Sequence, residues 1–252
     1  MIYNLKKYYY GEILERSEEF YNSIKKRRSV KKFSRKKIPF QVIKNCILSA
    51  NNAPFTSYEK PWHFVIIKDS VVKKKIRIKV EQEDADYYDK LATKEWLKDL
   101  ELFVYGDKQK DKRNDVFCST SLYPFLLRNE KPERKDEKRL IIYPDRSFLE
   151  EAPYLIVIFA TEYFVDQQGK KIYYDSVDEG VGIATGFLIT ALHQSGLAML
   201  PYILNPTHFL NKICRRTANE KPVFLIAVGS PKEGTKVPEI PPVAFEKIAT
   251  VL

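Results

Sequence analysis

The sequence predicts an α+β fold in one domain, residues 1–252, with helices around a central sheet of about four or more strands. Two observations carry this prediction. In the first part of the chain, apolar residues recur at spacings of three, four and seven, as in amphipathic helices. The second part holds short apolar and β-branched runs of strand length, which alternate with helical segments. A chain of 252 residues can bury most of its unfolded surface in one large domain.

The composition is that of a globular protein, with 44% hydrophobic and 13% aromatic residues. No apolar run approaches the roughly 20 residues that cross a bilayer, and the first residues lack the apolar core of a signal peptide. We therefore expect a cytoplasmic protein with no membrane partner. Cys46, Cys118 and Cys214 are widely spaced, which favours reduced thiols over a zinc site or a disulfide framework. We expect no metal.

The formal charge of +10 raises the possibility of a nucleic-acid partner. Lysines and arginines are, however, spread along the whole chain and mixed with acidic residues. This distribution does not favour a nucleic-acid-binding surface, and we expect no nucleic-acid partner.

In the first half, Pro39 begins one helix, and the stretch Asn51-Asn52-Ala53-Pro54 ends it. A long charged helix carries Asp84 and Tyr88, which are four residues apart and so share a face. Residues 106–145 have charge runs without a sustained period and are predicted to be an insertion or a lid extension. The predicted helices are 12–26, 40–51, 71–91 and 93–103, and the predicted strand is 60–69.

In the second half, Gly169 marks a turn, and Ser176 with Glu179 forms the pattern of a capping box at a helix start. That helix is apolar on nearly every side and rich in glycine, so we expect it in the middle of the fold. Gly196 ends it. Three prolines leave the C-terminal tail extended. The predicted strands are 154–160, 197–204 and 223–229, and the predicted helices are 176–195 and 206–216.

Arg27-Arg28-Ser29 follows the first helix and has two interpretations. Cations at a helix C-terminus are commonly a solvated end that the helix dipole favours. A guanidinium and a hydroxyl in sequence are also donors that suit phosphate oxygens.

The familiar nucleotide and hydrolase motifs are missing from the sequence: no G-x-G-x-x-G, no Walker lysine motif, no G-x-S-x-G and no metal-spaced His/Cys cluster. This excludes most nucleotide hydrolases, dinucleotide-fold dehydrogenases, serine hydrolases and zinc enzymes. A cofactor held in another way remains compatible with the sequence.

The order of several short stretches resembles the FMN-dependent nitroreductase superfamily, and within it the iodotyrosine deiodinase branch. The stretches are Arg27-Arg28-Ser29, Ala53-Pro54 with Pro61-Trp62 seven residues on, 150–154, the helix 180–196 and 228–231. The resemblance implies a mostly antiparallel sheet flanked by helices. It also implies an intertwined homodimer with FMN at the subunit interface.

The resemblance also implies site residues, although it assigns no catalytic side chain. The FMN phosphate would be held by Arg27, Arg28 and Ser29, and the isoalloxazine would lie by Pro54, Phe55, Thr56, Ser57, Ile203 and Leu204. A zwitterionic aromatic substrate would contact Asp84, Tyr88, Arg146 and Ser57.

Three departures from the family pattern bear on function. The loop that normally reads Pro-Ser-Gly-Ala has Phe55 and Thr56, which puts bulk where a flavin should stack. The stretch 201–204 lacks the hydroxyl that the deiodinases place near flavin N5, so we expect two-electron reduction and poor deiodination. The tail 237–243 offers no cation to the phosphate.

The preferred interpretation is an FMN-dependent oxidoreductase. NADH or NADPH reduces the flavin, which then reduces a nitroaromatic, quinone-like or halotyrosine-like substrate in ping-pong fashion. The alternatives are a non-catalytic binder of flavin or of a zwitterionic aromatic ligand, and a basic nucleic-acid-associated protein.

Overall fold

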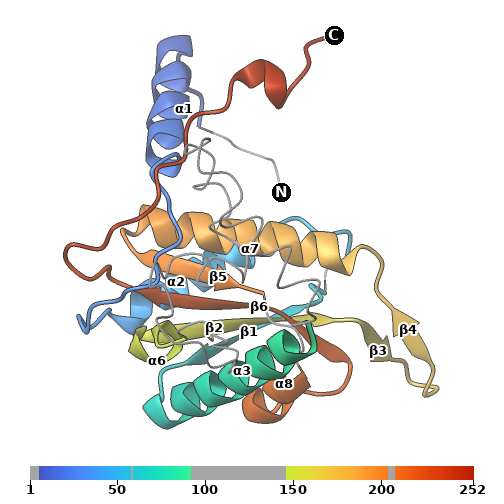
Figure 1. Ribbon diagram of the computed structural model, residues 1–252. Helices are drawn as coiled ribbons and strands as arrows, with labels where there is room; N and C mark the ends of the chain where they lie inside the picture. The colour runs from blue at the N-terminus through green and yellow to red at the C-terminus, as the bar shows by residue number, and fades with distance from the viewer. Residues whose placement is uncertain (1–5, 58, 92–145, 204–207) are drawn as a thin grey trace.

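The computed structural model describes residues 6–57, 59–91, 146–203 and 208–252, with the backbone alone for 85–91 and 208. Its centre is a four-stranded, wholly antiparallel sheet in the order β1-β2-β6-β5, with helices on both faces (Figure 1). The strands are β1 Trp62–Ile67, β2 Tyr154–Thr161, β6 Glu220–Gly229 and β5 Ala198–Tyr202. The α+β prediction is confirmed. The predicted helix 93–103 and the proposed insertion 106–145 lie outside the described residues.

Strand β2 is buried along almost its whole length, which fixes the layers of the fold. Successive side chains of a strand point to opposite faces of the sheet. Leu155, Val157 and Phe159 therefore pack into the core on one face, while Ile156 and Ile158 pack into the core on the other. A strand with apolar residues at every position needs helices on both sides, and the fold provides them.

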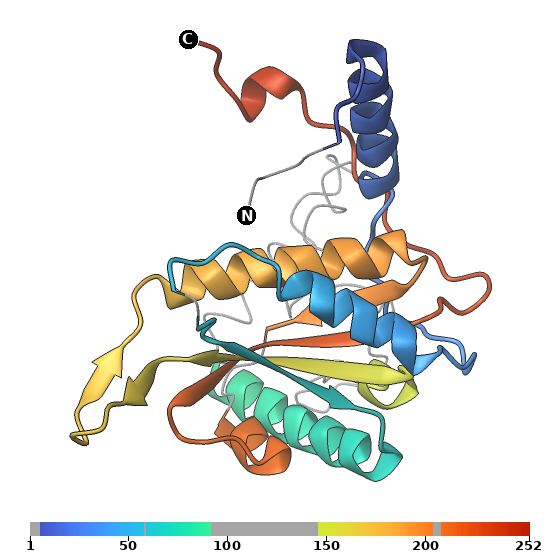
Figure 2. The same cartoon turned by 180° about the vertical axis from the view of Figure 1, so that it is seen from behind.

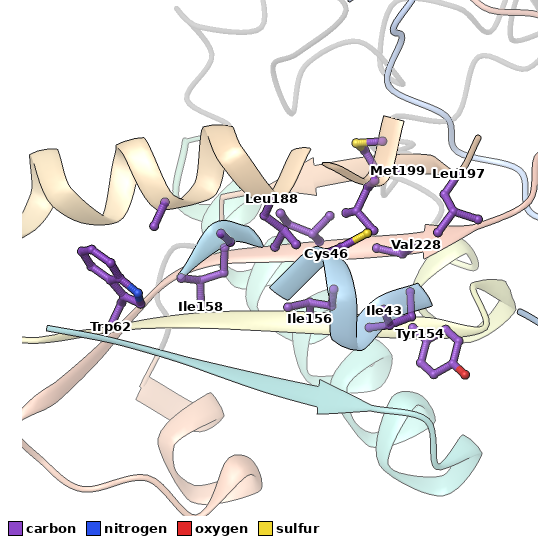
Figure 3. Packing of buried hydrophobic residues seen from close by; sticks show 14 of the residues in the cluster. Ile43, Cys46, Trp62, Tyr154, Ile156, Ile158, Leu188, Leu197, Met199 and Val228 are labelled. Carbon is purple, nitrogen blue, oxygen red and sulfur yellow. The ribbon is translucent and has the colours of Figure 1, made fainter. Parts of the chain in front are cut away.

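The helices α2, Phe40–Ala50, and α7, Val177–Gln194, cover the face of Ile156 and Ile158, where Ile43, Cys46 and Leu188 meet the sheet (Figure 3). The opposite face is covered by α3, Ser70–Leu91, α6, Phe148–Glu151, and α8, His208–Cys214 (Figure 1).

Two prolines lie where a sheet tolerates a missing N–H. Pro222 is in β6, opposite the irregularity between Ile158 and Phe159 of β2. Pro201 is in β5, which is an edge strand.

The structure corrects two details at α7. Ser176 precedes the helix in a left-handed conformation, φ 56°, and its side chain makes no capping hydrogen bond, so the predicted capping box does not form. The helix is also not enclosed on all sides, because Ile183 and Phe187 are exposed. A short hairpin that the sequence did not predict precedes α7, with strands β3 Tyr163–Val165 and β4 Lys171–Tyr173. Gly169, φ 81°, lies in its turn as expected.

Helix α1, Tyr10–Ile24, and the C-terminal tail with its short helix η1, Phe245–Lys247, stand away from the sheet on the same side (Figures 1 and 2). None of the residues of α1 is buried in the part of the chain that the structure describes, although its sequence is amphipathic. Several large apolar side chains of α1 and of the tail are exposed: Ile13, Leu14, Phe20, Phe245 and Ile248.

Across the described ranges, no helix is both long and apolar enough to cross a membrane. Within the same ranges, no group of three or more histidine, cysteine or acidic side chains could hold a metal ion.

The half-buried Cys214 gives a test of this packing. Burial raises the pKa of its thiol to about 11, although the charge of Arg216 opposes the shift. At pH 8 such a thiol carries about one hundredth of the thiolate of a thiol with pKa 9. We expect iodoacetamide to alkylate Cys214 about 100-fold more slowly in the native protein than in urea, measured by peptide mass spectrometry. Equal rates would contradict the packing around Cys214.

Candidate functional site

The turn after α1 joins the arginine cluster to the edge of the sheet. The N–H of Val30 donates to the carbonyl of Met199 at 3.0 Å, and Ser29 forms a parallel bridge with Met199. Strand β5 therefore fixes where the cluster Arg27-Arg28-Ser29 lies.

Arg28 connects this turn to the C-terminal tail. Its Nε donates to the carbonyl of Pro238 at 3.0 Å, and its Nη1 donates to the carbonyls of Lys25 and Arg27 at 2.6 and 2.8 Å. The tail thus contributes a backbone acceptor to the cluster. Two of the three guanidinium nitrogens of Arg28 order the surrounding backbone.

Arg27 is half-buried, and within the described ranges its guanidinium has no hydrogen bond and no ion pair. Burial lowers the pKa of Arg27, and the neighbouring charge of Arg28 lowers it further. A desolvated cation beside a second cation is unfavourable unless an anion balances it. The cluster therefore has the charge and the donors of an anion site.

In the loop Pro54–Ser57, the side chain of Phe55 does not lie where the sequence led us to expect it. The Phe55 ring packs against Trp62 edge to face, with centroids 5.6 Å apart and planes at 76°, and it joins the core. Its bulk therefore points into the protein and does not stand over the loop. Thr56 is exposed, and the hydroxyl of Ser57 accepts a hydrogen bond from the N–H of Glu59 at 3.2 Å.

One face of α3 enters the core and ends in a carboxylate. Lys73, Ile76, Val80 and Asp84 recur every three or four residues, which places them on the same face. The Nε of Arg146 donates to Oδ2 of Asp84 at 2.7 Å, and the two side chains are 4% and 15% exposed. The structure thus brings together two of the predicted substrate residues from positions 62 apart in the chain.

Tyr202, at the end of β5, completes this group. Its hydroxyl donates to the Asp84 carboxylate at 3.4 Å, and its ring lies 4.7 Å from the guanidinium carbon of Arg146. Nη2 of Arg146 is buried and has no hydrogen-bond partner in the part of the chain that the structure describes. The sequence reasoning missed the role of Tyr202, because nothing in its local pattern separates it from other strand residues.

Lys73 and Arg77 hold the short helix α6, which follows Arg146. The buried ammonium of Lys73, 7% exposed, donates to the carbonyls of Glu150 and Ala152 at 3.1 and 2.7 Å. Burial lowers its pKa. Arg77 bridges Glu81 and Glu150. The sequence did carry a signal for Lys73, since it shares the apolar stripe of Ile76 and Val80.

Strand β5 places the two groups relative to each other. Met199 contacts the arginine cluster and Tyr202 contacts Asp84. Three residues of strand span about 10 Å. Ile203 follows and is 70% exposed. The side chain of Tyr88 and all of Leu204 lie outside the described residues.

The chain is similar to known proteins along most of its length. The model of the Nitroreductase family matches residues 24–230. The iodotyrosine deiodinase of Haliscomenobacter hydrossis is 38% identical over 231 residues, which cover 91% of this chain and 86% of the relative. The human iodotyrosine deiodinase 1 is 32% identical over 232 residues, 91% of this chain and 67% of the relative.

Among solved structures, iodotyrosine deiodinase bound to FMN and 3-iodo-L-tyrosine superposes with a TM-score of 0.63 at 23% identity, covering 92% of this chain and all of the other. The FMN-bound nitroreductase of Bacteroides fragilis gives 0.56 at 17% identity, covering 93% and 98%. These likenesses support the fold. The chain belongs to the Nitroreductase family, in the branch that its iodotyrosine deiodinase relatives represent.

Proposed function

We propose that the protein is an FMN-dependent oxidoreductase that reduces a small aromatic substrate with an amino-acid head group, of the halotyrosine type. The observation that carries the proposal is the Arg146–Asp84 pair. The pair offers one cation and one carboxylate that are both nearly buried, in a chain with the fold of the Nitroreductase family. The halotyrosine class takes further support from the relatives, which are iodotyrosine deiodinases.

The residues present fit FMN. Arg27 is a half-buried cation without an anion among the described residues. The hydrogen bonds that Arg28 forms with described residues come from Nε and Nη1, which leaves Nη2 to donate to a ligand. These groups, with the hydroxyl of Ser29, would hold the phosphate. The loop Pro54–Ser57 and Ile203 would lie along the ring, where the inward packing of Phe55 leaves the loop free of its bulk.

FMN held at this site would supply the redox chemistry, which is transfer of two electrons from NADH or NADPH to the aromatic substrate in two successive half-reactions. The side chains of the protein bind and orient. Arg146 takes the carboxylate of the substrate and Asp84 takes its ammonium group, so the zwitterion replaces the internal pair with matched charges. Tyr202 holds Asp84 toward Arg146. The exposed Ile203 offers no hydroxyl to the flavin, so we expect the protein to favour two-electron over one-electron reduction.

The lack of a cation in the tail was one argument for a non-catalytic binder, and the bulk of Phe55 was the other. Because the ring packs against Trp62, that argument loses its basis, and we favour the enzyme.

We also propose that the protein is an intertwined homodimer. Helix α1, the exposed side of α7 at Ile183 and Phe187, and the tail present apolar side chains that a monomer would leave in water. Apolar surface of this extent marks an interaction site in a soluble protein.

Arg27 tests the cofactor site. We expect the purified protein to bind FMN, and Arg27→Ala to raise the Kd for FMN at least about tenfold, because a charge-assisted hydrogen bond contributes roughly 1.5–3 kcal/mol. Fluorescence titration measures the Kd. Riboflavin, which lacks the phosphate, should bind both proteins equally, and Lys26→Ala controls for net charge. Wild-type protein that takes up no FMN would refute the cofactor. An unchanged Kd in the variant would refute the role of Arg27.

Asp84 tests the substrate class. Calorimetry on the FMN-loaded protein would compare L-tyrosine with 3-(4-hydroxyphenyl)propionate, which keeps the carboxylate and lacks the ammonium group. We expect the wild type to prefer the amino acid, and Asp84→Asn to lower that preference about tenfold or more, since a neutral amide attracts an ammonium group weakly. Arg146→Lys, which keeps the charge, should retain the preference. Equal selectivity in wild type and Asp84→Asn would exclude Asp84 from the site.

Light scattering tests the dimer. We expect a mass twice the 29.5 kDa of the chain, and a shift toward monomer for Phe187→Glu, because a buried carboxylate opposes association. Phe164→Glu on the β3–β4 hairpin is a matched control, since Phe187 and Phe164 are 44% and 40% exposed. A wild-type protein of monomer mass at micromolar concentration would overturn the proposal.

A further inference from the structure

Gly180 lies in the first turn of α7, next to the Phe55 side chain of the loop Pro54–Ser57. A Cβ atom at this position would lie 2.6 and 2.8 Å from Cδ2 and Cε2 of Phe55, and 3.2 Å from Cζ3 of Trp62. Carbon atoms do not pack this closely, so any side chain at residue 180 would displace one of the two rings.

Trp62 has little freedom to move. It is buried, its Nε1 donates to Oδ1 of Asn51 at 3.2 Å, and Lys60 lies over its ring. The ammonium group of Lys60 also binds the carbonyls of Asn51 and Ala53, which closes the base of the loop. A methyl group on residue 180 would therefore push out the Phe55 ring, which yields by a change of rotamer or by a shift of the loop backbone.

We infer that Phe55 anchors the loop Pro54–Ser57 and that Gly180 is the positioning residue on which this anchor rests. The base of the loop is pinned by Lys60, whereas Phe55 is the apolar contact that joins its middle to the core. Gly180 thereby fixes the position of Thr56 and Ser57 relative to the proposed site of the flavin ring. This inference rests on the proposed FMN site and assigns a role to a residue outside it.

A double-mutant cycle on the full-length protein tests the inference, with Gly180→Ala, Phe55→Ala and the double variant. We expect Gly180→Ala to weaken FMN binding at least tenfold and to shift the absorption bands of the bound flavin. Phe55→Ala should weaken binding less, since the loop loses its anchor without being pushed. The double variant should bind within about twofold of Phe55→Ala, because the added methyl group then fills the space that the ring leaves.

Thermal melting of the same proteins supplies a second readout. Gly182→Ala adds a methyl group to the same helix where no atom of the described part of the chain lies within 4 Å, so within one subunit it reports the gain in helix propensity. We expect Gly180→Ala to melt below Gly182→Ala, and Phe55→Ala to remove that difference.

Three results would separate the possibilities. Wild-type affinity for FMN in Gly180→Ala, or losses that add in the double variant, would overturn the inference while leaving the FMN site in place. A wild-type protein that binds no FMN would remove the proposed function, and the melting cycle would still test the contact. If Gly180→Ala does not fold, Phe55→Ala alone decides: unchanged affinity and unchanged flavin bands would refute the anchor.

Discussion

The burial of β2 on both faces is the constraint on which the rest of the structure depends. Because apolar side chains leave this strand in both directions, helices must cover both sides of the sheet. Strand β2 also pairs with β6 along its whole length, with one irregularity between Ile158 and Phe159, and β6 in turn fixes β5 at the edge. Strand β5 then carries one contact to the arginine cluster at Met199 and another to Asp84 at Tyr202. The spacing of the candidate site is thus inherited from the core.

The pair of Arg146 and Asp84 is costly where it stands. Removing two charges from water often costs more than their attraction returns, and apolar replacements of buried pairs are commonly neutral or stabilising. Here the cost is increased by a buried guanidinium nitrogen without a partner among the described residues. Lys73 is a third buried charge, and it donates hydrogen bonds to the end of the helix that follows Arg146. Stability alone does not account for this arrangement, whereas the proposed binding of a charged head group would account for it.

The fold was predictable from the sequence where one pattern decided the outcome. The unbroken apolar run at 154–160 could only be a buried strand, and the periodic segments at 40–51 and 71–91 formed helices with nearly those bounds. The capping pattern at Ser176 failed because the backbone there turns left-handed, which tertiary contacts decide. The exposed side of α7 was missed for a related reason. An apolar helix has the same sequence pattern whether the core of its own chain or the surface of another molecule covers it.

Only part of the candidate site was predictable. The resemblance named Asp84 and Arg146, and their pairing follows from the stripe that Ile76 and Val80 define on α3. The inward turn of Phe55 depends on the missing side chain of Gly180, more than a hundred positions away. The loop sequence alone shows that residue 55 is bulky, but it does not show that Gly180 leaves space for the ring.

Helix α1 links the proposed phosphate site to the proposed dimer. It has 15 residues and buries none of them within the described structure, and an isolated helix of that length is marginal in water. Yet the helix ends at the turn that holds Arg27 and Arg28, and Arg28 also fastens the equally exposed tail. The proposed anion site is therefore only as ordered as two segments that are largely exposed in the described structure. A partner subunit that covers both segments would order the helix and the phosphate site together, so association and flavin binding would stabilise each other.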